Sequence, residues 1–125
     1  RTADALAVPV VLLPGCADAW NPKVVRASMG AAFRAVPVSM TREAAVASCR
    51  ANGVRLLATA LRADAHDLRE ETLSQTAVTI GSAGRGVCRE LLDAADGTVI
   101  IPMQSHCESL NAAVAATIVM WQMRR

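Results

Sequence analysis

The sequence predicts one α/β domain with a mostly parallel sheet and helices on both of its faces. Short apolar runs alternate with segments of helical pattern along the whole chain, as in parallel sheets with helical crossovers. Hydrophobic residues make up 53% of the 125 residues and charged residues 19%, a balance that favours a packed core over disorder. Only three aromatic residues are present, Trp20, Phe33 and Trp121, so the core must be largely aliphatic.

The first half of the chain contains three predicted strands and two predicted helices. Residues 1–6 read as one helical turn, and the apolar run 8–13 reads as a strand buried on both faces. Asn21 and Pro22 are suited to the start of a helix, which should end near Phe33 or Arg34. A short edge strand follows at residues 36–38. A second helix begins at residues 41–43 and ends at residues 52–53, before a third strand at residues 54–59.

The second half is expected to contribute two more strands and two more helices. Residues 61–74 are polar and read as a loop with one helical turn. Strands are predicted at residues 77–80 and 98–101, with a helix at residues 87–95 between them. Asn111 can cap a last helix whose residues 112–121 are apolar nearly all round. Such a helix must be covered on more than one side, by the sheet and by a second subunit.

The carboxyl ends of three predicted strands mark a candidate binding site. They carry Thr59, Gly81 and Ile101, and ligands of open α/β sheets bind beyond such ends. The glycines of residues 81–86 are spaced GxxGxG and lack the Lys-Ser/Thr of a phosphate-binding P-loop. Taken alone, this loop is equally well explained as a tight turn.

Charge and cysteine usage exclude several classes of protein. The net charge is +2, with twelve scattered arginines and one lysine, so charge alone does not identify a nucleic-acid-binding protein. No apolar run approaches the about 20 residues of a membrane span. The four cysteines form no CxxC pair, which argues against a zinc site or other metal centre and favours reduced thiols in a cytoplasmic protein.

Three motifs carry a resemblance to a known family. The chain begins with Arg1-Thr2-Ala3-Asp4-Ala5, continues with the glycine loop 81–86, and later shows Ile101-Pro102-Met103 followed by Ser109-Leu110-Asn111. In this order they resemble the motifs of the SpoU (TrmH) family of RNA ribose methyltransferases, within the SPOUT superfamily. The segment 21–31 is also similar to a family helix.

The resemblance implies a deep C-terminal trefoil knot, a homodimer, and S-adenosylmethionine as the cofactor. It implies methyl transfer to a ribose 2′-hydroxyl of rRNA or tRNA. By position it assigns cofactor contacts to Thr59, Gly81, Ile101, Met103 and Leu110. It assigns catalytic roles to Arg1, Ser109 and Asn111, with the arginine orienting the hydroxyl and stabilising developing negative charge.

Two departures from the family pattern lead to an alternative function. Ala83 stands where the family usually has glutamate, and the asparagine of the first motif would precede Arg1. We therefore expect an N-terminally truncated methyltransferase domain, without its RNA-binding domain, that binds the cofactor and is weak or inactive. The alternative is a non-catalytic module that binds S-adenosylmethionine or RNA. A dinucleotide-dependent enzyme is disfavoured by the glycine spacing.

Several candidate residues also have purely structural explanations. Ser109 and Asn111 are suitable helix-capping residues, and His106 and Cys107 suit an exposed loop without a catalytic partner. Arg26 can contact RNA phosphates or simply belong to a solvated helix face. Arg85, in the glycine loop, is the better candidate for RNA contact.

Overall fold

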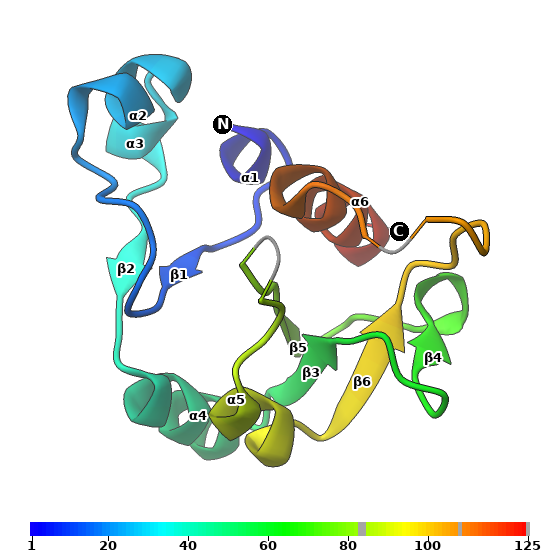
Figure 1. Cartoon of the computed structure of the whole chain (residues 1–125). Coiled ribbons are helices and arrows are strands. Elements are labelled where there is room, and N and C mark those ends of the chain that lie inside the picture. The colour runs from blue at the N-terminus through cyan, green and yellow to red at the C-terminus, as the bar shows by residue number, and fades with distance from the viewer. Residues whose placement is uncertain (83–84, 108, 125) are drawn as a thin grey trace. The chain divides into compact units, whose positions relative to one another are not determined.

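Figure 1 shows the computed structural model of the chain, which describes residues 1–82, 85–107 and 109–124. The chain divides into two compact units, Arg1–Ala45 and Val46–Arg125. Each unit contains parallel strands connected through helices, which confirms the predicted α/β class and the mostly parallel sheet.

The first unit is built around a two-stranded parallel sheet. Its elements are α1 (Thr2–Ala5), β1 (Val11–Leu12), α2 (Pro22–Ala27), α3 (Ala31–Arg34) and β2 (Val38–Ser39). The prediction of a buried strand at residues 8–13 is wrong, because only two of these residues form β1 and Val11 is 45% exposed. In the described residues β1 pairs only with β2, so one of its edges is unpaired. The apolar run does not show how many strands pair with it.

The single helix predicted from Pro22 to Phe33 or Arg34 is interrupted. Asn21 caps α2 as predicted, because its side-chain oxygen accepts a hydrogen bond from the Lys23 backbone N–H at 2.9 Å. The backbone then turns left-handed at Met29 (φ 53°) and Gly30 (φ 86°) before α3 begins. Two consecutive residues with positive φ end an α-helix, so the prediction of one continuous helix is wrong.

The helix α4 (Arg42–Ala51) has the predicted boundaries and leads into the second unit. At its start, the Thr41 hydroxyl oxygen accepts a hydrogen bond from the Ala44 backbone N–H at 3.1 Å. At its end, Gly53 adopts a left-handed conformation with φ 65°, as predicted for the residue after a helix.

The second unit contains a four-stranded, fully parallel sheet. The strands are β3 (Arg55–Thr59), β4 (His66–Asp67), β5 (Thr76–Thr79) and β6 (Gly97–Ile100), in the order β4-β6-β3-β5. The predicted helical turn is the 3-10 helix η1 (Leu68–Glu70). The strand β4 was not predicted, because two residues in a polar stretch give no periodic signal.

The core of this unit lies between the sheet and the last helix, α6 (Ala112–Met123). Leu57 and Val99 pack there with Leu68 and with Val119 of α6, all at most 3% exposed. Burying one such side chain contributes about 1.5–3 kcal/mol. Side chains alternate along a strand, so Ala58 points to the opposite face, where it is also completely buried. The central strand β3 is therefore covered on both faces, and α5 (Arg89–Ala94) contacts it.

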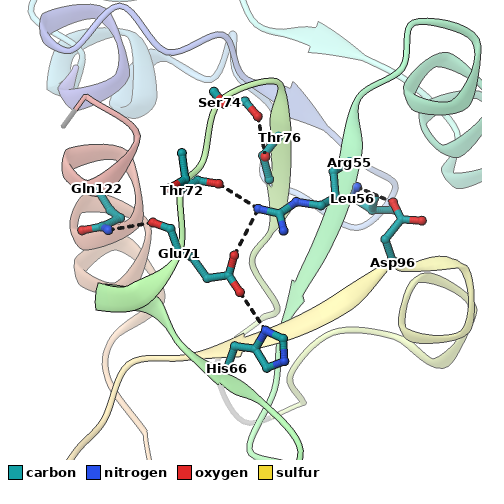
Figure 2. Close-up of polar contacts among 9 residues, drawn as sticks. All are labelled: Arg55, Leu56, His66, Glu71, Thr72, Ser74, Thr76, Asp96 and Gln122. Carbon is teal, nitrogen blue, oxygen red and sulfur yellow. Dashed lines mark hydrogen bonds and ion pairs between the residues drawn. The ribbon is translucent and has the colours of Figure 1, made fainter.

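A polar network around Glu71 ties α6 to the sheet (Figure 2). The Glu71 carboxylate pairs with Arg55 at 3.1 Å and with His66 Nδ1 at 2.8 Å, and its side chain is only 12% exposed. The hydrogen bond from His66, followed by the interactions with Arg55, lowers the pKa of Glu71. The Gln122 amide of α6 donates to the Glu71 backbone oxygen at 3.0 Å, and Arg55 also donates to the Thr72 carbonyl at 2.8 Å.

A second polar contact fixes the start of the sheet. The Leu56 backbone N–H donates to the Asp96 carboxylate at 2.8 Å, and the Asp96 N–H donates to the Leu56 carbonyl at 2.7 Å. Asp96 also contributes, after burial itself, to raising the pKa of the nearby Cys49 thiol. All four cysteines are free thiols in the structure.

Candidate active site

The carboxyl ends of the parallel strands in the second unit lie at one edge of its sheet. The Thr59 hydroxyl, at the end of β3, donates to the Thr79 carbonyl at the end of β5, over 3.1 Å. The Ala60 N–H donates to the Val99 carbonyl of β6 at 3.1 Å. Three strand ends are thus joined at the edge where the sequence predicts a ligand site.

The loop after β5 requires a glycine at position 81. A Cβ atom at this position would lie 2.1 Å from the backbone carbon of Gly86 and 2.3 Å from the backbone nitrogen of Val87. The loop closes by a hydrogen bond from the Gly86 N–H to the Ser82 carbonyl at 2.9 Å. Arg85 is exposed in this turn, whereas Ala83 lies outside the residues that the structure describes.

An open cavity of about 500 Å³ lies beyond the carboxyl ends of β4 and β6. Its lining combines apolar and polar side chains, from Arg69, Pro102, Met103, Gln104, Cys107, Ser109 and Leu110. Three residues predicted for the site, Met103, Ser109 and Leu110, therefore lie around one cavity. Thr59 and Gly81 are not part of this lining, and Ile101 packs against the hydrophobic core instead.

Arg69 is a member of this cavity that the sequence analysis did not find. Its guanidinium pairs with the Asp67 carboxylate, with a shortest distance of 2.6 Å, and its backbone N–H donates to the same carboxylate at 2.9 Å. The hydrogen bonds from Arg69 lower the pKa of Asp67. Asp67 and Arg69 are two residues apart in a polar stretch of the sequence. Their pattern is the same as in a solvated loop, so it does not indicate a binding site.

Asn111 is engaged as a helix cap. Its side-chain oxygen accepts from the backbone N–H groups of Ala113 at 2.9 Å and Val114 at 3.2 Å. The structural explanation of Asn111 is thus confirmed, and only its amide nitrogen remains for contact with a substrate. Ser109, two residues earlier, is exposed and lines the cavity.

The remaining predicted residues belong to the first unit. Arg1 precedes α1 and is exposed. Arg26 is exposed on α2, where its side chain donates to the Pro22 carbonyl at 3.3 Å. Their roles in catalysis and in RNA binding stay predictions.

Within the described part of the chain, no three His, Cys, Asp or Glu side chains are grouped so that they could hold a metal ion. No helix of residues 1–82, 85–107 and 109–124 has the length and apolar character needed to cross a membrane.

Residues 1–121 match the SpoU rRNA Methylase family, which is nearly the whole chain. The chain belongs to this family. The resemblance carried by the three motifs is thereby confirmed.

Named relatives in the family act on different RNAs. The chain is 35% identical over 125 residues to the 23S rRNA (guanosine(2553)-2′-O)-methyltransferase of Bacillus subtilis, covering 99% of the chain and 50% of that protein. It is 43% identical over 74 residues to the tRNA (guanosine(18)-2′-O)-methyltransferase of Thermus thermophilus, covering 58% of the chain and 38% of that protein.

Solved structures agree with the family assignment. An rRNA methyltransferase from Sinorhizobium meliloti with bound AdoMet superimposes with a TM-score of 0.91 at 31% identity, covering 100% of the chain and 49% of that protein. The SpoU methyltransferase AviRb from Streptomyces viridochromogenes, in complex with AdoMet, gives a TM-score of 0.86 at 31% identity, covering 100% of the chain and 52% of that protein. The chain thus spans about half the length of these relatives.

Proposed function

We propose that this chain is a catalytic domain that transfers a methyl group from S-adenosylmethionine to a ribose 2′-hydroxyl of rRNA or tRNA. The observation that carries the proposal is the cavity beyond β4 and β6, where Met103, Ser109 and Leu110 from the third family motif line one space. Family membership and relatives named as 2′-O-methyltransferases of both RNA classes support it.

The cavity suits a cofactor that has both apolar and polar parts. Pro102, Met103 and Leu110 offer apolar surface, while the Gln104 amide offers hydrogen-bonding groups. A volume of about 500 Å³ falls within the range of about 300–1,000 Å³ that is usual for small-molecule sites. When bound, S-adenosylmethionine supplies an electrophilic methyl group on a sulfonium sulfur.

The glycine loop and the neighbouring strand ends complete the proposed cofactor site. Thr59, Gly81 and Ile101 stand at the carboxyl ends of β3, β5 and β6. Thr59 holds the ends of β3 and β5 together through its hydroxyl. Gly81 allows the backbone of Gly86 and Val87 to approach more closely than any side chain would permit, so the loop closes tightly after β5.

Methyl transfer requires that the ribose hydroxyl be oriented and that negative charge on its oxygen be stabilised. On the family resemblance, we assign the orientation to the Arg1 guanidinium. We assign a hydrogen bond to the ribose to Ser109, and its exposed position in the cavity lining supports this. Asn111 contributes through its amide nitrogen, because its oxygen is committed to capping α6.

We further propose a homodimer formed through α6, and a trefoil knot in the C-terminal part of the chain. Val114, Ile118 and Trp121 lie on one side of α6 and are 38–64% exposed, which supports a covering partner. A second copy is the partner that the family resemblance implies. A cytoplasmic location is also proposed, and the four free thiols support it.

Calorimetric titration with S-adenosylmethionine and a methyl-transfer assay on rRNA and tRNA test the function. Ser109→Ala should lower the transfer rate by about 100-fold, as loss of one charge-stabilising donor does, and leave cofactor affinity nearly unchanged. Ser105→Ala is the matched control, since Ser105 is exposed in the same loop and does not line the cavity. Binding of NAD in place of S-adenosylmethionine would contradict the proposal.

A non-catalytic module remains the second candidate, because Ala83 replaces the usual glutamate. Ala83→Glu distinguishes the two functions. A large gain in methyl transfer indicates an enzyme weakened at this position, whereas S-adenosylmethionine binding with no transfer before or after the change indicates a binding role.

A further inference from the structure

All three aromatic residues of the chain are exposed, although burying such side chains is the usual way in which they stabilise a fold. Trp121 belongs to the α6 surface already assigned to a second copy. Trp20 and Phe33 are 51% and 67% exposed, and their ring centroids lie 5.8 Å apart in a tilted arrangement. The first unit therefore presents an aromatic pair to solvent that the proposed reaction does not use.

Trp20, one member of the aromatic pair, borders a second cavity. This depression of about 460 Å³ lies where β1 and β2 end, and it is lined by residues 12–20, Pro37 and residues 39–41. Trp20 is held at its border because the Asp18 carboxylate accepts a hydrogen bond from the Trp20 backbone N–H at 2.9 Å. The ring is thus presented from a defined turn next to a space at the carboxyl ends of parallel strands.

Positive charge accompanies the aromatic pair. Residues 1–45 carry five Lys/Arg and three Asp/Glu, whereas residues 46–125 carry eight of each, so the whole net charge lies in the first unit. Lys23 and Arg26 follow Trp20 at intervals of three residues and are exposed on α2. Within the described part of the chain neither joins an ion pair, while Arg34 is paired with Asp4 at 2.9 Å.

We propose that Trp20 and Phe33 form a stacking platform for an unpaired base of the RNA substrate, and that Lys23 and Arg26 contact the adjoining phosphates. Aromatic faces beside a basic surface are the usual means of holding single-stranded RNA. Asp18 in the lining repels a phosphate but can accept from an amino group on a base edge, so a base suits the depression. The inference rests on the proposed RNA methyltransferase function and adds to it where the RNA is held.

Intrinsic fluorescence offers a direct test. In a Trp121→Phe background, Trp20 is the only tryptophan of the chain. Titration with a single-stranded RNA of about 12 nucleotides should quench its emission, because a stacked base lies against the indole ring. The same sequence as a perfect duplex should quench much less, since its bases are not available for stacking.

Affinity measurements with variants separate stacking from structural damage. Trp20→Ala should weaken binding of a fluorescein-labelled copy of this RNA about tenfold, which corresponds to about 1.4 kcal/mol, while Trp20→Phe should retain most of the affinity. Lys23→Gln combined with Arg26→Gln should reduce the salt dependence by roughly 1.4 in the slope of log K against log salt. S-adenosylmethionine affinity should not change in any of these variants.

Three results would contradict the stacking platform or the proposed function, and they can be told apart. Unchanged RNA affinity in Trp20→Ala overturns the stacking platform and leaves the methyltransferase function intact. A change in molecular mass for Trp20→Ala, with RNA affinity unchanged, shows that a protein surface covers the aromatic pair, which also overturns it. If the unaltered chain binds S-adenosylmethionine but neither binds nor methylates any RNA, the proposed function itself fails.

Discussion

Replacing Gly81 with alanine should disrupt the loop after β5, because the added methyl group would clash with backbone atoms. The new Cβ would lie 2.1, 2.3 and 2.5 Å from three backbone atoms of Gly86 and Val87. Carbon atoms pack best at about 3.5–4.0 Å, so the two backbone segments must separate by more than about 1 Å. No side-chain rotation relieves this clash, because every atom involved is backbone.

The loss of stability in Gly81→Ala depends on the side chains that pack beside the loop. Val87 is only 8% exposed, so moving it outward opens the packing around its buried side chain. Overpacking of a rigid site costs about 1–3 kcal/mol and sometimes more, and a backbone clash of this depth belongs at or above the upper limit. For a domain of this size, about 3 kcal/mol lowers the melting temperature by about 10 °C.

Thermal unfolding followed by circular dichroism, together with calorimetric titration of S-adenosylmethionine, measures both effects. Gly97→Ala is the matched control, because a Cβ there meets only the Leu57 side chain at 3.4 Å. It should change stability by about 1 kcal/mol or less. If Gly81→Ala melts within a few degrees of the unaltered chain and binds the cofactor equally well, the close approach of Gly81 and Gly86 is not needed for either property.

Three further predictions concern the polar network, the cap and the proposed dimer surface. Glu71→Gln should lower stability by about 1 kcal/mol at pH 7, since a neutral amide replaces the carboxylate that pairs with Arg55 and His66. The pKa of Glu71 is lowered in the folded state. The stability difference between Glu71→Gln and the unaltered chain should therefore be complete above the ordinary glutamate pKa and vanish as the pH falls through the lowered pKa. Urea unfolding from pH 7 to pH 3 measures this difference. Asn111→Ala should cost about 1 kcal/mol of stability, because the cap is lost. Asn111→Asp should keep the cap, and it should lose methyl transfer only if the amide nitrogen contacts the ribose. Melting temperature and methyl-transfer rate, measured on both variants, distinguish these effects. Ile118→Asp, on the exposed side of α6, should shift the molecular mass measured by light scattering from dimer to monomer, and a monomeric unaltered chain would contradict the proposed interface.

Local signals in the sequence predicted most of the second unit. The cap at Asn111 and the left-handed Gly53 depend on residues adjacent to the helix ends, so the pattern of the chain is enough to place them. The strand β3 was predicted because Leu56, Leu57 and Ala58 form a short apolar run after the helix end at Gly53, and all three are buried.

The wrong and missing predictions concern strand pairings between residues distant in sequence and one backbone turn inside a helical pattern. Residues 8–13 have the composition of a central strand, but whether a strand becomes central depends on how many neighbours pair with it. The left-handed turn at Met29 and Gly30 is compatible with a continuous helical pattern around it, so periodicity alone did not reveal it. Arg69 lies at the cavity because β4 pairs with β6. A polar strand of two residues gives no pattern from which this pairing could be predicted.

The distribution of side-chain hydrogen bonds explains how one sheet can be stable and still hold an open cavity. Arg55 and Asp96 make their contacts at the first residues of β3 and just before β6, and Glu71 extends this fixation to Gln122 of α6 (Figure 2). At the carboxyl ends, backbone bonds and the Thr59 hydroxyl join the strands, while Met103, Ser109 and Leu110 stay available around the cavity. Because α6 is anchored near its carboxyl end by Gln122 and capped at its start by Asn111, its position does not depend on the side chains that line the cavity. A ligand there can therefore be bound by groups whose loss leaves the fold intact, which is the reason to expect Ser109→Ala to affect transfer and not stability.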